Sequence, residues 1–250
     1  MKGFILQVQD DGHFAPDVSV VYEIIKTRNW LYPNDGFEVR ECNFNDLNKE
    51  VVSGFVPVGS VEFVNKALSF YNISPMRPIN IPPILNEEKY LCRKIITVKN
   101  KEEIKELFKK WNINRLFIKS NSQVKLHDPD VIDNKTDFFF DSDYFVSEEI
   151  DIVSEWRCFV YRGELKGIKH YAGDEWCMPN KSFVDECISK IDNTLPAYTL
   201  DIGITNDNKN VVVEVHNFVS CGLYGFEDFS LIPMLINGYK RELLQNSKNI

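Results

Sequence analysis

A predicted β-hairpin near the end of the chain constrains the fold more than any other stretch. Two apolar segments, 199–204 and 211–216, flank a polar turn centred on Asp207 and Asn208. Because successive side chains on a strand alternate between its two faces, antiparallel pairing about this turn gives the hairpin one apolar face. The pairs predicted on that face are Leu200 with Val215, Ile202 with Val213, and Ile204 with Val211.

The other face of this hairpin brings two acids together, since the same register places Asp201 opposite Glu214. Directly opposed residues have Cβ atoms roughly 5 Å apart, and like charges there destabilise the pair. One reason for such a pair is a hard cation, because Mg²⁺ is held by one or two carboxylates together with the phosphates of a nucleotide. The other interpretation is a solvated face with two ordinary acids. If the acids repel each other, Asp201→Asn is expected to keep or raise stability.

The composition argues against two broad classes of protein. A hydrophobic content of 44%, with 13% aromatic residues, allows a sizeable core and argues against a disordered chain. The net charge of −8 argues against a nucleic-acid binder held by bulk charge. We therefore expect a folded protein without a nucleic-acid partner.

Cysteine usage and hydropathy favour a reduced, cytoplasmic location. The six cysteines form no C-x-x-C pair and lie mostly within apolar patterns, as buried free thiols do. No apolar run approaches the roughly 20 residues of a membrane span. The apolar stretch after Lys2 is too short for a signal peptide. No membrane partner is expected.

Residues 1–85 are predicted to form a small α/β domain. A strand at 3–8 is followed by weaker helical periodicity, and Ser60 is suited to cap a second helix. The segment 74–83 carries four prolines, which exclude helix or central strand and indicate an extended connector at a domain boundary. No glycine-rich phosphate loop follows the first strand, so this part carries no nucleotide signature.

Three basic residues precede the acidic hairpin. Arg93 lies in a predicted strand at 90–98, Lys119 ends a short apolar strand, and Lys125 follows across a polar loop. A lysine at the end of an apolar strand is often a surface residue whose stem packs along the protein. The three cations together, ahead of two opposed carboxylates, favour a polyphosphate site in which lysine acts as a point charge.

A second predicted hairpin turns at Arg162 and Gly163. By alternation, Glu155 and Arg157 share one face of its first strand. One interpretation is an exposed ion pair, which contributes little to stability. The other is a phosphate contact beside an acceptor for sugar hydroxyls.

The order of short motifs along the chain resembles the ATP-grasp superfamily. The resemblance covers roughly residues 55–226 and is closest to the phage and bacterial clade named for one arginine and two lysines. Each motif is weak alone, and the likeness rests on their order and spacing. The motifs are VPVGSVEFV, the CRK strand, FIKSNSQVK, FVSEEI, SEWRCFVYRG and DIG…VVVEVHN…GLYG.

This resemblance implies an α+β fold with ATP held between two α+β subdomains. The subdomains would be residues 86–150 and 151–250, and residues 1–85 would be the smaller pre-ATP-grasp α/β domain that precedes them. The implied nucleotide-binding residues are Arg93, Lys119, the hinge Glu148, Glu149 and Ile150, and the ribose-binding acid Glu155. The implied catalytic cations are Arg157 and Lys125, and the implied Mg²⁺ ligands are Asp201 and Glu214.

The chain departs from the family pattern at the end of the second hairpin strand. Such families usually read Glu-x-Asn there, whereas this chain has His216 followed by Asn217. If the strand is regular, His216 faces the site and Asn217 does not, while a bulge after Glu214 would bring Asn217 in. Imidazole is a poor partner for Mg²⁺. Both residues are therefore carried as candidate metal ligands.

The function implied by the resemblance is ATP- and Mg²⁺-dependent ligation of a carboxylate to an amine through an acyl phosphate. The partners are then ATP, a carboxylate substrate and an amine acceptor, with a peptide or protein terminus among the candidates. A nucleotide-binding regulatory protein on a decayed ATP-grasp fold is the alternative that His216 favours. A phosphotransferase acting on a hydroxyl group is a third interpretation.

Overall fold

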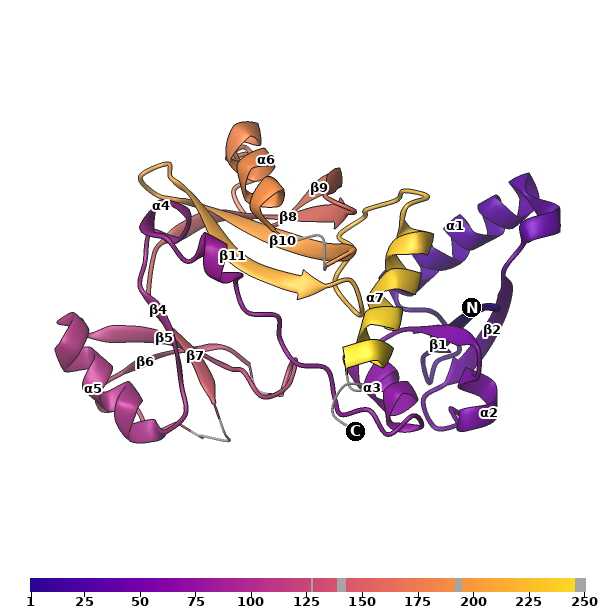
Figure 1. Cartoon of the computed structure of the whole chain (residues 1–250), viewed down its shortest axis with the longest axis horizontal. Helices are drawn as coiled ribbons and strands as arrows, with labels where there is room; N and C mark the ends of the chain where they lie inside the picture. Colours follow the sequence, from indigo (N-terminus) through magenta and orange to yellow (C-terminus); the bar gives the residue numbers. More distant parts are fainter. Residues whose placement is uncertain (127, 139–142, 192–194, 246–250) are drawn as a thin grey trace.

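The computed structural model describes residues 1–126, 128–138, 143–191 and 195–245, which form three β-sheets with helices against them. Figure 1 shows the three units: one from the N-terminal part of the chain, one around β4 to β7, and one around β8 to β11. The mixed helix and strand content agrees with the predicted α+β class. Within the described residues, no helix combines the length and apolarity needed to cross a membrane.

The N-terminal unit is a parallel three-stranded sheet in the order β2-β1-β3. The helix α3 begins where predicted, because the Ser60 hydroxyl accepts a hydrogen bond from the Phe63 N–H at 3.2 Å. The elements are β1 (Gly3–Val8), α1 (Pro16–Leu31), η1 (Pro33–Asp35), β2 (Glu38–Asn43), α2 (Lys49–Val52), β3 (Phe55–Val58) and α3 (Val61–Ser69).

The second unit is an antiparallel sheet in the order β4-β7-β5-β6, covered by one helix. The Asn100 side chain caps this helix by accepting from the Glu103 N–H at 2.8 Å, and Ile104, Leu107 and Phe108 are buried against the sheet. The elements are β4 (Ile95–Val98), α5 (Lys101–Trp111), β5 (Arg115–Ser120), β6 (Asp130–Asp133) and β7 (Tyr144–Glu148).

The third unit is an antiparallel sheet in the order β11-β10-β8-β9. The predicted turn at Arg162 and Gly163 is present, with φ of 51° and 75°. The two strands of the acidic hairpin, β10 and β11, pair with each other, and β8 pairs with the other side of β10. The elements are β8 (Ile152–Tyr161), β9 (Glu164–Gly173), α6 (Lys181–Lys190), β10 (Ala197–Thr205) and β11 (Asn210–Asn217).

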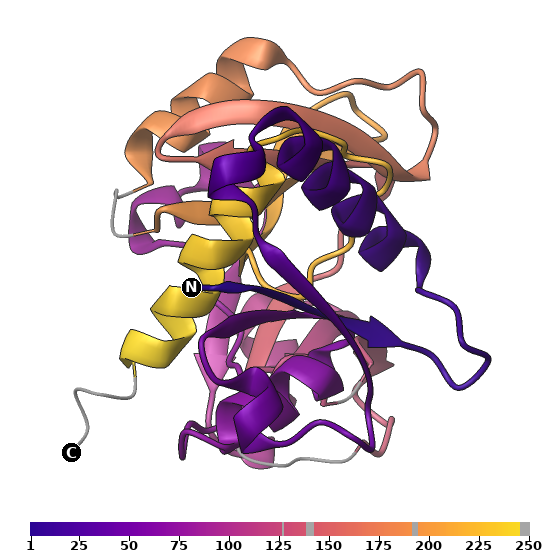
Figure 2. The ribbon, with the colours of Figure 1, turned by 90° about the vertical axis from the view of Figure 1, so that its right-hand side faces the viewer.

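Packing joins the first and third units. The last helix, α7 (Leu231–Gln245), lies beside α1 against the N-terminal sheet, as Figure 2 shows. Leu231 and Tyr239 share a core with Phe4 and with Phe159 of β8, whose ring stacks on Phe226 at 4.1 Å between centroids. The core therefore crosses the predicted boundaries at residues 85 and 150, and the division into three domains stays a prediction.

The proline-rich connector is extended as predicted, but it also contributes contacts. Ile79 forms an isolated antiparallel bridge with Val215 of β11, and the Val124 N–H donates to the Met76 carbonyl at 2.9 Å. The connector ends in two short helices, η2 (Pro83–Leu85) and α4 (Glu88–Leu91). Because Leu85 and Leu91 are buried in the core of the third unit, the connector fixes the second unit relative to the third.

Two local predictions are wrong. Residues 90–98 are not one strand: α4 ends at Leu91, Cys92 adopts a left-handed conformation with φ of 49°, and β4 begins only at Ile95. Arg93 therefore lies in a turn. In the acidic hairpin, Asp201 does lie opposite Glu214, but the register then shifts, so that Ile202 pairs with Val212 and Ile204 with Asn210. The extra residue on β11 is a β-bulge.

Candidate active site

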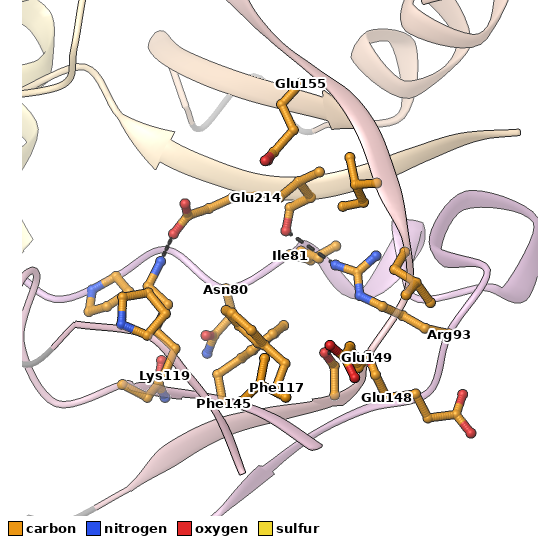
Figure 3. A pocket seen from close by; sticks show the side chains of 18 of the residues that line it. Asn80, Ile81, Arg93, Phe117, Lys119, Phe145, Glu148, Glu149, Glu155 and Glu214 are labelled. Atoms are coloured by element: carbon orange, nitrogen blue, oxygen red, sulfur yellow. Dashed lines mark hydrogen bonds and ion pairs between the residues drawn. The ribbon is translucent and has the colours of Figure 1, made fainter. Parts of the chain in front are cut away.

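A cavity of about 400 Å³ lies between the second and third sheets. Figure 3 shows Glu155 and Glu214 directed into it from the third sheet, while Lys119, Phe117 and Phe145 come from the second sheet. The connector supplies another wall, with Pro78, Ile79, Asn80 and Ile81. The cavity is therefore bounded by three segments that are far apart in the sequence.

The bulge in β11 shapes one wall of this cavity. Because Val213 is the extra residue, both Val213 and its neighbour Glu214 line the cavity, although regular alternation would send them to opposite faces. Arg93 donates to the carbonyls of Val212 and Val213 at 3.1 and 3.4 Å. These two carbonyls lie where the bulge disrupts the β-ladder. The guanidinium therefore supplies them with hydrogen-bond donors that the strand pairing does not supply.

Asp201 lies at the centre of the third sheet and pairs with an arginine. Arg157, on the neighbouring strand β8, donates to the two Asp201 carboxylate oxygens at 2.9 and 2.7 Å. The side chains are only 8% and 2% exposed. Burial opposes the charge on Arg157, but the ion pair with Asp201 raises the pKa of the guanidinium above its usual value. Neither interpretation of Arg157 made from the sequence included this buried pair.

Glu214 is held from both sides. Lys119 of β5 forms an ion pair with Glu214 Oε1, which joins the second and third sheets across the cavity (Figure 3). The other oxygen, Oε2, lies 2.7 Å from His216 Nε2. Burial lowers the pKa of His216 to about 3, with a contribution from Lys119, so the imidazole beside Glu214 is neutral.

Glu155 faces the cavity from β8 and is oriented by a tyrosine that the sequence did not single out. The Tyr171 hydroxyl donates to Glu155 at 2.8 Å and lies 3.5 Å from an Asp201 oxygen. Burial and these two acids raise the pKa of Tyr171, so the hydroxyl keeps its proton. The Tyr171 ring stacks on Tyr224, with 5.0 Å between centroids, and the Arg157 guanidinium lies over both rings.

The predicted hinge lines the same cavity. Glu148 is the last residue of β7, and Glu149 and Ile150 follow it; all three line the cavity at the end where Phe117 and Phe145 form an apolar wall. The Glu148 carboxylate accepts from the Lys94 N–H at 2.8 Å, and the Glu149 carboxylate pairs with Arg115 at 3.0 Å. The Lys94 ammonium also lies 3.1 Å from Glu148, so both acidic side chains have a cationic partner.

Five of the predicted site residues do not line this cavity: Arg157, Asp201 and His216 contact residues that do, whereas Asn217 and Lys125 lie elsewhere. The Asn217 amide donates to Glu242 of α7 at 2.5 Å and to the Gly238 carbonyl at 3.1 Å, so it contacts the last helix. The bulge lies before Glu214, not after it, and therefore does not turn Asn217 towards the acids. Asn217 therefore contacts α7 in this structure, and its role as a metal ligand stays a prediction. Lys125 lines a second, neighbouring cavity.

The residues present fit Mg²⁺ that is bound together with a nucleotide. Glu214 offers a partly exposed carboxylate in the cavity, and Mg²⁺ in such sites takes one or two carboxylates plus phosphate oxygens. Asp201 is a weaker candidate because Arg157 occupies both of its oxygens. No group of three or more histidine, cysteine or carboxylate side chains suited to a metal occurs among the described residues.

Several cavity residues could not be found from sequence motifs. The connector residues 78–81 lie over a hundred positions before the acids, and their proline content signals only an extended chain. Tyr171 gave no signal, because its partner Glu155 lies on a strand whose pairing register is irregular. Phe117 and Phe145 gave no signal either, because alternation along a strand does not show that an apolar side chain faces a cavity.

Comparison with known proteins agrees with this geometry. A model of the family described as "ATP-grasp domain, R2K clade family 2" matches residues 90–232, which is more than half of the chain. The chain therefore belongs to the R2K clade of ATP-grasp proteins. The match begins after residue 85, so the description of the N-terminal unit as a pre-ATP-grasp domain stays a prediction. No curated protein matches the sequence.

Solved structures show the same fold at low sequence identity. A RimK domain ATP-grasp protein from Sphaerobacter thermophilus has a TM-score of 0.55 at 15% identity, with 96% of this chain and 99% of that chain covered. D-alanine–D-alanine ligase from Bacillus anthracis gives 0.54 at 13% identity, with 98% of each chain covered. The ATP-grasp ligase PsnB, complexed with a minimal precursor, gives 0.53 at 12% identity, with 95% and 99% covered.

Proposed function

We propose that this protein is an ATP- and Mg²⁺-dependent ligase that joins a carboxylate to an amine. The observation that carries the proposal is the 400 Å³ cavity between the two antiparallel sheets, in which Lys119 meets Glu214 while Glu155 lies close by. Membership of the ATP-grasp family supports ATP as the nucleotide. The ligases among the similar structures support the class of reaction and not the substrates.

In this proposal each wall of the cavity binds one part of ATP. The apolar side chains Phe117 and Phe145 enclose the adenine, whose edge meets the backbone of the hinge after Glu148. Glu155 accepts hydrogen bonds from the ribose hydroxyls, since Tyr171 already holds one of its oxygens. Lys119 moves from Glu214 to the phosphates, and Glu214 is then free to hold Mg²⁺ with them.

The proposed reaction needs no covalent bond to the protein. A substrate carboxylate oxygen attacks the γ-phosphorus, and the bond from that phosphorus to the ADP oxygen breaks. The amine nitrogen then attacks the acyl carbon, phosphate leaves, and the nitrogen loses its proton to solvent. When bound, Mg²⁺ would be held by Glu214 and would neutralise charge on the phosphates. Lys119 and Lys125 stabilise the charge on the transferring phosphoryl group, whereas Arg157, whose Nε, Nη1 and Nη2 all donate within the protein, orders Asp201 and the loop at Gly222.

The direct test is hydroxylamine trapping, because hydroxylamine serves as a general amine that converts acyl phosphates to hydroxamates. We expect hydroxamate and ADP to form together when ATP, Mg²⁺ and a suitable carboxylate are present, and neither product to form without the carboxylate. Glu214→Gln should abolish both products. Glu164→Gln, which changes an exposed glutamate on β9, is the matched control. ADP formation that never depends on a carboxylate would contradict the ligase proposal.

A second candidate is a nucleotide-binding regulatory protein, and one observation favours it. His216 occupies the position where an asparagine is expected, and the acids beside it are held by Arg157 and Lys119. In that case the protein binds ATP without turnover under all the conditions above. A phosphotransferase on the same fold would instead form ADP with a hydroxyl acceptor and yield no hydroxamate.

A further inference from the structure

A second cavity, of about 270 Å³, lies between the N-terminal unit and the loop that follows β11. Its walls come from the end of β1, the first turns of α1, the start of α3 and residues 218–223. Lys125, from the loop after β5, reaches it from the second unit. All three units of the molecule therefore meet at this cavity.

The second cavity adjoins the phosphate end of the proposed ATP site. Arg157 donates through Nη1 to the Gly222 carbonyl at 3.1 Å, and Gly222 lines the second cavity. Cys221 lines it as well: burial raises the pKa of this thiol to about 12, and the charges of Arg157, Asp201 and Asp17 all act on it. A short loop segment thus separates Arg157 on one side from Asp17 on the other.

The charges in the second cavity are few and of opposite sign. Of the described residues that line it, only Asp17 and Lys125 are charged. One Asp17 oxygen accepts from the Leu223 N–H at 3.0 Å, and the described residues provide no hydrogen bond to the other oxygen. Lys125 likewise has no ion-pair partner among them. The remaining wall is largely apolar, with Val18, Val21, Val58, Phe218 and Leu235.

We propose that this second cavity binds the carboxylate substrate as a free α-amino acid. The ammonium group pairs with Asp17 and the carboxylate with Lys125, on the side of the cavity that adjoins the proposed ATP site. This inference rests on the proposed ligase function and adds the class of substrate. A small, partly apolar cavity with two opposite charges fits a zwitterion better than a single ion, since each charge finds a partner.

The same arrangement disfavours the carboxyl terminus of a peptide. The last residue of a peptide carries a carboxylate but no free ammonium. It would therefore cover Asp17 and leave the Asp17 carboxylate without a cationic partner. A charged group that loses water without gaining a partner costs more than the hydrogen bond it replaces. Selectivity for the free ammonium is therefore a direct consequence of Asp17.

The hydroxamate assay tests this inference, because hydroxylamine replaces the natural amine and only the carboxylate substrate varies. The probes are glycine, the common L-amino acids and their D enantiomers. For each active amino acid, the comparison compounds are its N-acetyl derivative, the deaminated carboxylate and a dipeptide ending in the same residue. We expect at least one free amino acid to give hydroxamate, and its three comparison compounds to give less than about a tenth of that rate.

The variant Asp17→Asn isolates the charge, since an asparagine oxygen can still accept from the Leu223 N–H. We expect the KM for the active amino acid to rise about tenfold or more, while Asp10→Asn, an exposed acid outside the cavity, has no effect. Equal rates with N-acetyl derivatives or dipeptides overturn the inference even if Asp17→Asn fails to fold. Hydroxamate from another carboxylate but from no free amino acid overturns the inference alone, whereas absence of hydroxamate from every carboxylate, with or without ATP binding, removes the proposed function too.

Discussion

At the scale of single residues, Asp201 and Glu214 are each already paired with a cationic side chain. Arg157 neutralises Asp201 within the sheet, and Lys119 neutralises Glu214 across the cavity. The repulsion expected between two directly opposed carboxylates is therefore relieved without a metal. The two pairs differ in burial, because Asp201 is 2% exposed while Glu214 is 24% exposed. We infer that the inner pair is structural and that the outer pair exchanges partners when a nucleotide binds.

The inner pair predicts the effect of Asp201→Asn on stability. The opposed acids alone suggested that this change keeps or raises stability, but the ion pair reverses the expected sign. Removing the carboxylate charge leaves Arg157 buried without a counter-charge, so the free energy of unfolding should fall by about 3 kcal/mol. Urea unfolding measures this change, and Asp207→Asn, at an exposed acid in the same hairpin, is the control that should change little. Unchanged stability in Asp201→Asn would show that the pair is not structural.

The outer pair predicts a pH dependence of nucleotide binding. Burial lowers the pKa of Lys119 to about 8, against the pull of Asp201. A bound phosphate stabilises the charged form, so affinity for ATP should fall as pH rises through about 8, where the free protein loses this proton. Affinity measured from pH 7 to 9.5 checks the trend. Lys119→Arg, which stays charged over this range, should flatten the profile, and a wild-type affinity that is constant over the same range would refute it.

At the scale of elements, the β-bulge in β11 shapes the site. It turns Val213 and Glu214 to the same side, and Arg93 satisfies the carbonyls at the irregular ladder. Arg93 therefore acts on the backbone in this structure, although it was expected to contact the nucleotide. Since β11 is an edge strand, the distortion disturbs only its pairing with β10.

This arrangement predicts that Arg93→Met lowers stability even without a nucleotide. The change leaves the carbonyls of Val212 and Val213 without their side-chain partner, and the free energy of unfolding should fall by about 2 kcal/mol. The loss should be smaller in a variant that also lacks Val213, because deletion of the extra residue restores a regular ladder. Urea unfolding of both variants and of the Val213 deletion alone tests this. An equal loss in the two backgrounds would contradict the role assigned to Arg93.

The sequence predicted those features that depend on one hairpin or one cap. Alternation placed Asp201 opposite Glu214, and Ser60 begins its helix as its side chain suggested. Features that depend on strand order were missed. The pair between Arg157 and Asp201 exists because β8 lies next to β10, and alternation within a strand carries no information about its neighbours. The bulge was missed because Val212 and Val213 are equally apolar.

At the scale of the whole molecule, two cavities meet beside Arg157. One lies between the second and third sheets and suits a nucleotide, and the other lies against the N-terminal unit and carries Asp17. Asp17 and Arg157 bind the same loop, at Leu223 and Gly222. The N-terminal unit thus forms one wall of the second cavity. The N-terminal sheet has no nucleotide signature because, on this account, its role is to bind the other substrate.

Calorimetric titration of ATP, with and without Mg²⁺, on wild type and on Glu214→Gln tests the central claim most directly. We predict micromolar binding to wild type that strengthens with Mg²⁺, because Lys119 transfers to the phosphates and releases Glu214 to hold the metal. Glu214→Gln should retain binding of free ATP and lose the enhancement by Mg²⁺, while Glu164→Gln should behave as wild type. No binding of ATP to wild type under either condition would contradict the assignment of the cavity as a nucleotide site.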